Sequence, residues 1–423
     1  MEAKAIAIAG WNASGKTQMV ERMRRQMKAD TVRYVAFCDT YGTATDRTYY
    51  LQQRWNQHDI DTETPTVGQS LERSFLLSGS DTPERRHYQQ LLYDMMGLGL
   101  LTDKYVISLS SGELRKMQLT KALMAQPQTL ILDNPYIGLD TEARRMLTQM
   151  LLTLKRQGIA LYMVVARPAD IPDFIDEVIW TTPQHEFQSI VAEETVPTGG
   201  GQSGNTPEIV RLNDVSIRYG TRTILNHLTW SIHAGEHWAL SGRNGSGKST
   251  LLSLLCADNP QSYACDITLF GQKRGSGETI WDIKRRIGYV SPELHRAYQR
   301  PLPALHIVAS GLRDTVGLYT HATQQEEQTC RQWMERFGLE HLAQRTFTQL
   351  SSGEQRLMLV CRAFVKNPDL LILDEPMHGL DLRNQRLVQG IIDDYCRDAT
   401  KTLIMVTHYP DELPACIDRH KQL

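Results

Sequence analysis

The sequence carries the same ordered set of motifs twice. The pentapeptide L-S-S-G-E occupies residues 109–113 and again 350–354, and L-I-L-D ends at Asp133 and at Asp374. G-L-D follows each of these runs, and the two copies of all three motifs are 241 residues apart. A glycine-rich G-x-x-x-x-G-K-[ST] motif also recurs, with Lys16 and Lys248 separated by 232 residues. Such repetition predicts two structural units built on one plan.

The chain of 423 residues is longer than one hydrophobic core usually organises. Residues 183–208 are rich in Gly, Pro and polar residues and have no apolar periodicity, which is typical of a flexible linker. We therefore predict a first domain over 1–182, a linker over 183–208 and a second domain over 209–423. In each domain apolar runs alternate with amphipathic segments, which predicts an α/β fold with a parallel sheet.

Charge, cysteine spacing and hydropathy give no sign of a nucleic-acid-binding, metal-binding, membrane-spanning or secreted protein. A formal net charge of -2 gives no global attraction for nucleic acid or for an anionic membrane. The seven cysteines show no C-x-x-C pair and no cysteine/histidine ligand spacing, so we expect structural or incidental thiols in a reducing compartment. Because long apolar runs are missing and the amino terminus leads straight into a motif, we expect neither a membrane span nor a cleavable leader.

The two glycine-rich motifs have the context of phosphate-binding loops, because each follows an apolar strand and opens a helix. Glycines let the backbone N–H groups surround phosphate oxygens, lysine meets the β and γ phosphates, and the final hydroxyl binds Mg²⁺. The predicted ATP-binding residues are Gly10, Asn12, Ser14, Gly15, Lys16 and Thr17 in the first copy and Gly242, Asn244, Gly245, Ser246, Gly247, Lys248, Ser249 and Thr250 in the second.

L-S-S-G-E followed by L-I-L-D and G-L-D resembles the signature, Walker B and D-loop motifs of ABC ATPases, over nearly the whole chain. In that family two cassettes pack head to tail, so the resemblance implies composite ATP sites within one polypeptide. Ser110 and Gly112 would then contact one nucleotide, and Ser351 and Gly353 the other. An isolated L-S-S-G-E is also a good helix N-cap. Both copies depart from the usual L-S-G-G-Q at the third and fifth positions.

The two copies differ where water would be activated. The second has L-I-L-D-E-P, so the resemblance implies that Glu375 orients and activates water, whereas the first has Asn134, a neutral amide. M-V-T-H aligns with M-V-V-A, which sets the phosphate-sensing His408 against Ala166. We therefore expect hydrolysis at the second phosphate loop and slow turnover at the first, unless another carboxylate reaches the water there. The implied Mg²⁺ ligands are Thr17, Asp133, Ser249 and Asp374.

Other assignments rest on resemblance alone. Tyr219 matches the family's adenine-stacking aromatic residue, with a core tyrosine as the alternative. Glu293 and Cys38 stand where the family has its Q-loop glutamine, and Gln52 and Gln53 are possible substitutes.

The second half contains R-L-N-D-V-S-I-R-Y, G-E-H-W, Q-S-Y-A-C-D-I-T-L-F-G, R-G-S-G-E-T-I-W-D-I-K and I-G-Y-V-S. With these runs it also resembles the tandem ATP-binding proteins associated with molybdate transport, which are sometimes labelled photorepair proteins. This resemblance implies a bacterial cytoplasmic ATPase that docks on a membrane permease at the inner face of the plasma membrane. The alternative is a regulator that acts on a ribosome, nucleic acid or another protein. Molybdate itself is implied by the family's naming and by no residue of this chain.

Overall fold

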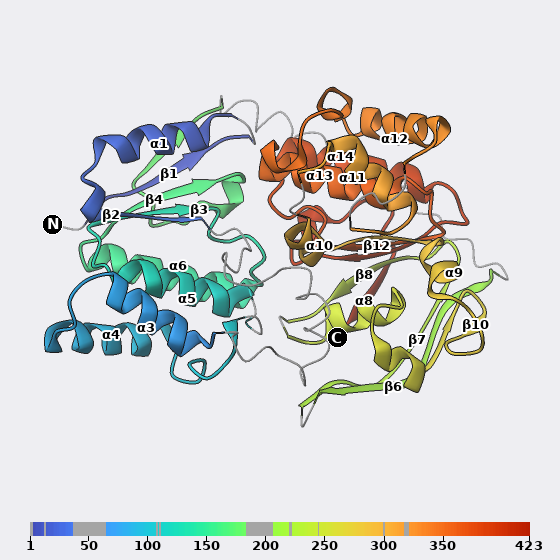
Figure 1. Cartoon of the computed structure of the whole chain (residues 1–423), viewed down its shortest axis with the longest axis horizontal. Coiled ribbons are helices and arrows are strands. Elements are labelled where there is room, and N and C mark those ends of the chain that lie inside the picture. The colour runs from blue at the N-terminus through green and yellow to red at the C-terminus, as the bar shows by residue number, and fades with distance from the viewer. Residues whose placement is uncertain are drawn as a thin grey trace. The chain divides into compact units, whose positions relative to one another are not determined.

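Two five-stranded parallel sheets organise the chain (Figure 1). The computed structural model describes residues 3–11, 14–36, 65–106, 109, 111–182, 206–219, 222–243, 245–298, 301–316 and 321–423. Packing divides the chain into two units, Met1–Val191 and Ala192–Leu423. The predicted α/β architecture with parallel sheets is confirmed.

The sheet of the first unit has the order β2-β3-β4-β1-β5. Its strands are short and apolar, and β1 is buried along its whole length, as expected of a strand covered on both faces. The strands are β1 (Ala5–Ala9), β2 (Val32–Ala36), β3 (Thr129–Asp133), β4 (Ala160–Val165) and β5 (Glu177–Trp180). The helices are α1 (Lys16–Gln26), α3 (Val67–Leu77), α4 (Pro83–Met96), α5 (Ser111–Leu123) and α6 (Thr141–Arg156).

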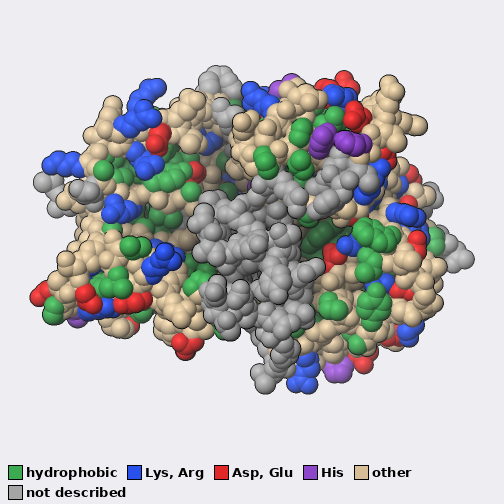
Figure 2. Space-filling model, in the orientation of Figure 1, with side chains coloured by type: hydrophobic (Ala, Val, Ile, Leu, Met, Phe, Trp, Pro, Cys, Tyr) green, Lys and Arg blue, Asp and Glu red, His purple; other side chains and the backbone are tan. Residues whose placement is uncertain are grey.

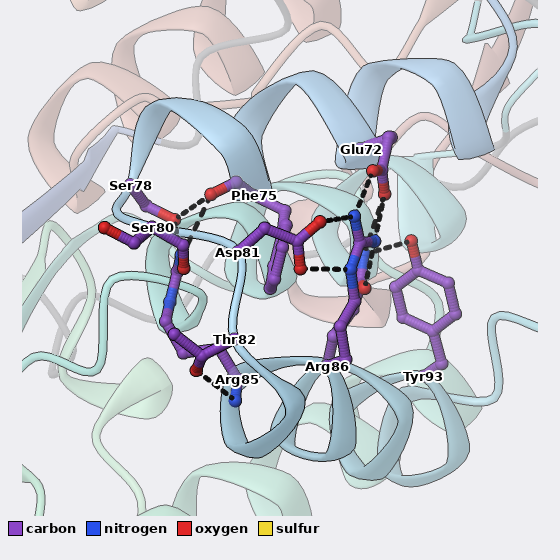
Figure 3. Close-up of polar contacts among 10 residues, drawn as sticks. Glu72, Phe75, Ser78, Ser80, Asp81, Thr82, Arg85, Arg86 and Tyr93 are labelled. Atoms are coloured by element: carbon purple, nitrogen blue, oxygen red, sulfur yellow. Dashed lines mark hydrogen bonds and ion pairs between the residues drawn. The ribbon is translucent and has the colours of Figure 1, made fainter.

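A network of ion pairs orients α3 against α4 (Figure 3). Arg86 of α4 bonds through Nη2 to Glu72 Oε1 at 2.7 Å and to Asp81 Oδ2 at 2.6 Å. Its guanidinium also lies 4.2 Å from the centroid of the buried Phe75 ring. Because the three charged side chains are 39–49% exposed, solvent screens these ion pairs. The packing of Phe75 therefore does more than the charges to hold the two helices together.

The parallel sheet of the second unit has the order β11-β12-β13-β8-β14. Its strands are β8 (His237–Ser241), β11 (Ile287–Val290), β12 (Leu370–Asp374), β13 (Thr402–Val406) and β14 (Arg419–Gln422). Strands β12 and β13 are fully buried. The helices are α8 (Lys248–Leu255), α9 (Ile280–Lys284), α10 (Pro292–Ala297), α11 (Ala304–Ala309), α12 (Gln324–Arg336), α13 (Ser352–Phe364) and α14 (Leu382–Cys396).

The two sheets have equivalent topology. In each sheet, the strand that leads into the glycine-rich loop is the neighbour of one edge strand. In the first unit β1 lies between β4 and the edge strand β5, and in the second β8 lies between β13 and the edge strand β14. Asp133 pairs with Val164, and Asp374 pairs with Val406. This shared register fixes which residues of the two units are equivalent.

The second unit carries an additional antiparallel sheet with the order β10-β9-β6-β7. It consists of β6 (Glu208–Tyr219), β7 (Arg222–His233), β9 (Asp266–Leu269) and β10 (Gln272–Lys273). Buried and exposed residues largely alternate along β6, as expected of a sheet with one covered face. The covered face packs on β8 and α8 through a shared apolar core. This sheet brings the end of the β6–β7 hairpin to the glycine-rich loop of the second unit.

Basic and acidic side chains are interspersed on the face drawn in Figure 2. In the part of the chain that the structure describes, no helix combines the length and the apolar character needed to cross a bilayer.

Candidate functional site

Both glycine-rich loops place a left-handed glycine immediately before a helix. Gly15 has a φ of +88° and precedes α1, and Gly247 has a φ of +99° and precedes α8. A side chain would be strained at either position. A Cβ on Gly247 would also lie 2.8 Å from Leu225 Cδ2, because the β6–β7 hairpin packs on the loop. The backbone therefore requires glycine, and the helix N-termini that follow are suited to bind an anion.

The two loop lysines make the same contacts. Lys16 Nζ donates to the carbonyl oxygens of Gly10 at 2.5 Å and Trp11 at 2.6 Å. Lys248 Nζ donates to Gly242 at 2.6 Å and Arg243 at 3.0 Å. Each lysine residue is less than a tenth exposed. Both ammonium groups are thus held against their loops, as a phosphate-binding lysine requires.

The serines of the two loops have different surroundings. Ser14 Oγ shares a 2.6 Å hydrogen bond with Thr181 Oγ1 in the first unit. Leu423 takes the place of Thr181 in the second, where it bonds to the loop strand through its backbone. Ser246 Oγ is buried and finds no hydrogen-bond partner among the described residues. An orphaned hydroxyl beside the helix N-terminus fits a site that accepts phosphate oxygens.

The structure describes some of the remaining predicted loop residues and not others. Thr17 and Ser249 stand in the first turns of α1 and α8, and Thr250 is buried. Gly245 is left-handed with a φ of +82°. Asn12 and Asn244 lie outside the described residues, as do Ser110, Cys38, Gln52 and Gln53, and the side chain of Glu293 is likewise not described.

An aspartate ends the central strand beside each loop. Asp133 Oδ2 accepts a 2.6 Å hydrogen bond from the hydroxyl of Tyr34. Burial raises the pKa of Asp133, although the Tyr34 hydrogen bond and the charge of Lys16 oppose this effect. Asp374 ends β12 and is buried. An aspartate at the strand end and a hydroxyl in the first helical turn form an oxygen donor set of the kind that Mg²⁺ prefers.

The residue after each aspartate has the same backbone and different chemistry. Asn134 and Glu375 are both left-handed, with φ of +51° and +49°. Their N–H groups donate to the equivalent carbonyls of Val164 and Val406, each at 2.9 Å. The Asn134 amide donates to Asp133 Oδ1 at 2.9 Å. Asn134 and Glu375 are therefore structurally equivalent, although the first carries an amide and the second a carboxylate.

Two histidines lie against the Glu375 carboxylate. His378 Nδ1 lies 3.0 Å from Glu375 Oε2, and His408 Nε2 lies 3.3 Å from Glu375 Oε1. Burial would raise the pKa of Glu375, but the contacts with His378 and His408 outweigh it and hold that pKa well below its usual value. The two contacts therefore favour the ionised form of Glu375.

The sequence prediction included His408 and missed His378. His408 follows Val406 by two residues, as Ala166 follows Val164, so the shared register supports the alignment of His408 with Ala166. His378 stands three residues after Glu375, where the first unit has Ile137. The only sequence signal for a role of His378 was that a histidine stands at this position in the second motif copy and not in the first.

The second signature motif starts α13 with a capping box. Ser351 is the N-cap, its hydroxyl accepts from the backbone N–H of Glu354, and the Glu354 carboxylate accepts from the Ser351 N–H at 2.8 Å. The glutamate that departs from the usual motif thus has a structural role. Gly353 is buried in the first turn. In the first unit Gly112 stands at the equivalent place in α5, where an added Cβ would meet Ala143 at an ordinary 3.6 Å.

Tyr219 ends β6, the first strand of the hairpin whose residues Ile224 and Leu225 lie against Gly247. Its hydroxyl accepts a 3.0 Å hydrogen bond from the side chain of the buried Asn259, and its ring packs partly on the apolar core. The contact fixes the ring's position, which suits both a stacking platform and a core tyrosine.

The chain is similar to proteins of one family. The family described as "ABC transporter" matches residues 1–137 and 225–378. The ABC transporter ATP-binding protein ModF of Escherichia coli (strain K12) is 34% identical over 456 residues, which span 97% of this chain and 89% of ModF. An uncharacterised ABC transporter ATP-binding protein of Schizosaccharomyces pombe is 28% identical over 411 residues, covering 92% of this chain and 82% of that protein.

A similar fold is found in the archaeal ribosome recycling factor aABCE1, solved in complex with the ribosomal stalk protein aP1. Its TM-score is 0.57 at 16% identity, and the match covers 100% of this chain and 83% of that chain. At this identity the likeness concerns the fold alone.

Proposed function

The chain belongs to the ABC transporter family of ATP-binding proteins, with two cassettes in tandem, and from this premise we propose that it hydrolyses ATP chiefly at the phosphate loop of the second cassette. The observation that carries the proposal is the placement of Glu375 beside Asp374, with His378 and His408 against its carboxylate. The first cassette has Asn134 on the same backbone.

Both cassettes would bind the triphosphate through their loops. Lys16 and Lys248 supply positive charge, and the N-termini of α1 and α8 supply backbone N–H groups. Mg²⁺, when bound, neutralises charge on the phosphates. Thr17 and Asp133 would hold it in the first cassette, and Ser249 and Asp374 in the second.

Glu375 would orient the attacking water and accept its proton. A carboxylate can do this, whereas the amide of Asn134 has no basic oxygen of comparable strength. The loss of a positioned general base commonly costs about 10² to 10⁴ in rate. We therefore propose one hydrolytic site and one site that retains Mg-ATP.

Each site would be completed by the signature motif of the other cassette, as the family resemblance implies. Ser110 and Gly112 would meet the nucleotide bound by Lys248, and Ser351 and Gly353 the nucleotide bound by Lys16. The support from this chain is that both signature motifs lie at helix N-termini, where N–H groups are available for a phosphate.

The stoichiometry of product tests the inequality of the two sites. The wild-type chain is incubated with excess [α-³²P]Mg-ATP and separated rapidly from free nucleotide, and the retained ATP and ADP are quantified. We expect two nucleotides per chain, with ADP appearing at one site while uncleaved ATP persists at the other. Equal cleavage of both retained nucleotides at one rate would contradict the proposal.

We further propose that the ATPase is the peripheral motor of a transporter and acts at the inner face of the plasma membrane. The support is the similarity over nearly the whole length to proteins named as ABC transporter ATP-binding proteins. The Glu375→Gln variant, loaded with ATP, is used to capture partners from membranes and cytosol of the source cell. A permease that co-purifies in an ATP-dependent manner supports the proposal, whereas ribosomes or nucleic acid would favour a regulator.

A further inference from the structure

Three potential metal ligands converge at the amino end of the second parallel sheet. His237 is the first residue of β8, Cys396 is the last residue of α14, and Cys416 precedes β14. One ligand atom from each lies within 4.8 Å of the other two. His237 and Cys396 are 159 residues apart in the sequence, and Cys396 and Cys416 are 20 apart. No local spacing could have revealed the cluster.

The imidazole of His237 is already oriented by backbone carbonyls. Its Nδ1 lies 3.2 Å from the oxygen of Cys416, and its Nε2 lies 3.2 Å from the oxygen of Lys401. A metal-binding histidine usually donates its other ring N–H to such an acceptor, which fixes the tautomer and the ring. Binding a cation through one nitrogen of His237 would replace that nitrogen's contact with its carbonyl, while the other nitrogen keeps its hydrogen bond.

The first cassette contains the same corner of the fold, which allows an internal comparison. The N–H of Ala5, at the start of β1, donates to Asp176 Oδ2 at 2.7 Å. The N–H of His237, at the start of β8, lies 3.4 Å from Asp418 Oδ1. Asp176 and Asp418 are 242 residues apart, the spacing that also separates Val164 from Val406.

The first cassette fills this corner with a cationic side chain. Lys155, at the position equivalent to Cys396, donates from Nζ to Asp176 Oδ1 at 2.6 Å and to the Phe174 carbonyl at 2.9 Å. Phe174 is equivalent to Cys416, being 242 residues before it. The second cassette thus lacks the ammonium group and has two thiols and an imidazole around the same place.

We propose that His237, Cys396 and Cys416 bind one Zn²⁺ ion per chain. Two thiolates and an imidazole form a donor set typical of zinc, with Zn–S of about 2.3 Å and Zn–N of about 2.0–2.1 Å. Ligand atoms around a tetrahedral ion of that size lie roughly 3.5–4 Å apart, so the side chains need to close only slightly. Asp393, whose Oδ1 accepts from the Cys416 N–H at 2.8 Å, offers a carboxylate for the fourth position.

The ion would act as a structural clamp. It would link the end of α14 and the segment before β14 to the start of β8, the strand that leads into the phosphate loop. The cluster lies at the amino end of β8 and the loop at its carboxyl end, roughly 16 Å away at about 3.3 Å per residue. Zinc binding should therefore be independent of ATP and of the proposed hydrolytic residues.

Metal binding to the full-length chain tests the proposal. The chain is reduced, stripped with a chelator and titrated with Co²⁺ and then with Zn²⁺ in competition with a chromophoric chelator. We expect one equivalent of Co²⁺ to give thiolate-to-metal charge-transfer bands and the visible bands of a tetrahedral site, which Zn²⁺ then abolishes. Cys396→Ser and His237→Gln should each weaken Zn²⁺ binding at least about tenfold. Cys265→Ser, which removes a thiol outside the cluster, should leave binding unchanged.

The wild-type titration alone can overturn the proposal, whether or not the variants fold. Less than half an equivalent of tightly bound Zn²⁺, or a Co²⁺ spectrum without thiolate bands, would do so. Binding that survives both Cys396→Ser and His237→Gln would also contradict it. A disulfide between Cys396 and Cys416 that forms in preference to metal binding under the same reducing conditions would show a redox pair instead.

Discussion

The residue that follows the strand-end aspartate sets the chemical difference between the two cassettes. Asn134 and Glu375 share a left-handed backbone and equivalent N–H bonds, so the fold supplies the same position twice. The Glu375 side chain is one methylene longer than that of Asn134 and ends in a carboxylate instead of an amide, and the carboxylate can take a proton from water.

Glu375→Gln should lower steady-state ATP turnover by about 10² to 10⁴. The amide keeps the shape of the side chain and the ATP affinity, but it cannot accept the proton. Asn134→Gln is the matched control, since it places the same residue on the equivalent backbone, and its turnover should stay within about twofold of wild type. A coupled phosphate-release assay measures both. Equal losses in the two variants would argue against unequal sites.

His378 should act on the rate through Glu375. Because contacts with His378 and His408 hold the pKa of Glu375 down against the effect of burial, removing one contact raises that pKa toward the ordinary value. More Glu375 is then protonated at acidic pH, so the acidic limb of the kcat profile should move to higher pH in His378→Asn. The exposed His341→Asn is the control. An unshifted limb with an unchanged kcat would exclude this positioning role for His378.

At the scale of elements, the β6–β7 hairpin connects the antiparallel sheet to nucleotide binding. Its first strand, β6, ends with Tyr219, whose hydroxyl accepts a hydrogen bond from Asn259. Leu225 of its second strand, β7, lies against Gly247 of the loop. The hairpin thus packs on the phosphate loop of the second cassette and carries an aromatic residue at the end of its first strand.

Tyr219→Ala should weaken ATP binding at the second loop by about 1–3 kcal/mol, the usual contribution of base–aromatic stacking, or roughly 5- to 150-fold in Kd. Tyr219→Phe keeps the ring and should keep the Kd, while it loses about 0.5–1.5 kcal/mol of stability with the hydrogen bond to Asn259. Titration calorimetry with a slowly hydrolysed ATP analogue and thermal unfolding separate the two effects. If Tyr219→Ala lowers Tm and leaves the Kd unchanged, Tyr219 is a core residue.

Elements with a continuous local pattern could be predicted from the sequence. The apolar runs predicted as strands at 5–9 and 370–373 lie in the buried parallel strands β1 and β12, because burial on both faces demands uninterrupted apolar residues. His378 and the cluster of His237, Cys396 and Cys416 were not predicted as sites. The three side chains of the cluster meet only through tertiary packing, and no period of the sequence records such a meeting. His378 lies only three residues from Glu375, and the difference between the two motif copies was its only signal.

At the scale of the whole molecule, the duplication provides two loops and two signature motifs that have diverged unequally. The second cassette keeps Glu375 and His408, and the first has Asn134 and Ala166. Yet each signature motif still starts a helix. If the first cassette had lost all function, it would not need Gly112 of its signature motif. If it completes the ATP site of the second cassette, as proposed, it would need that glycine.

The central claim is that the first cassette's signature serves hydrolysis at the second cassette's loop. The most direct test compares ATP turnover of Gly112→Asp with that of Gly353→Asp. An added Cβ at Gly112 would make only ordinary contacts, and an acidic residue is compatible with the first turn of a helix. The fold should therefore persist while the added charge repels a γ phosphate. We predict that Gly112→Asp reduces turnover by a factor comparable to Glu375→Gln, and that Gly353→Asp has the smaller effect. Wild-type turnover in Gly112→Asp together with abolished turnover in Gly353→Asp would contradict the account.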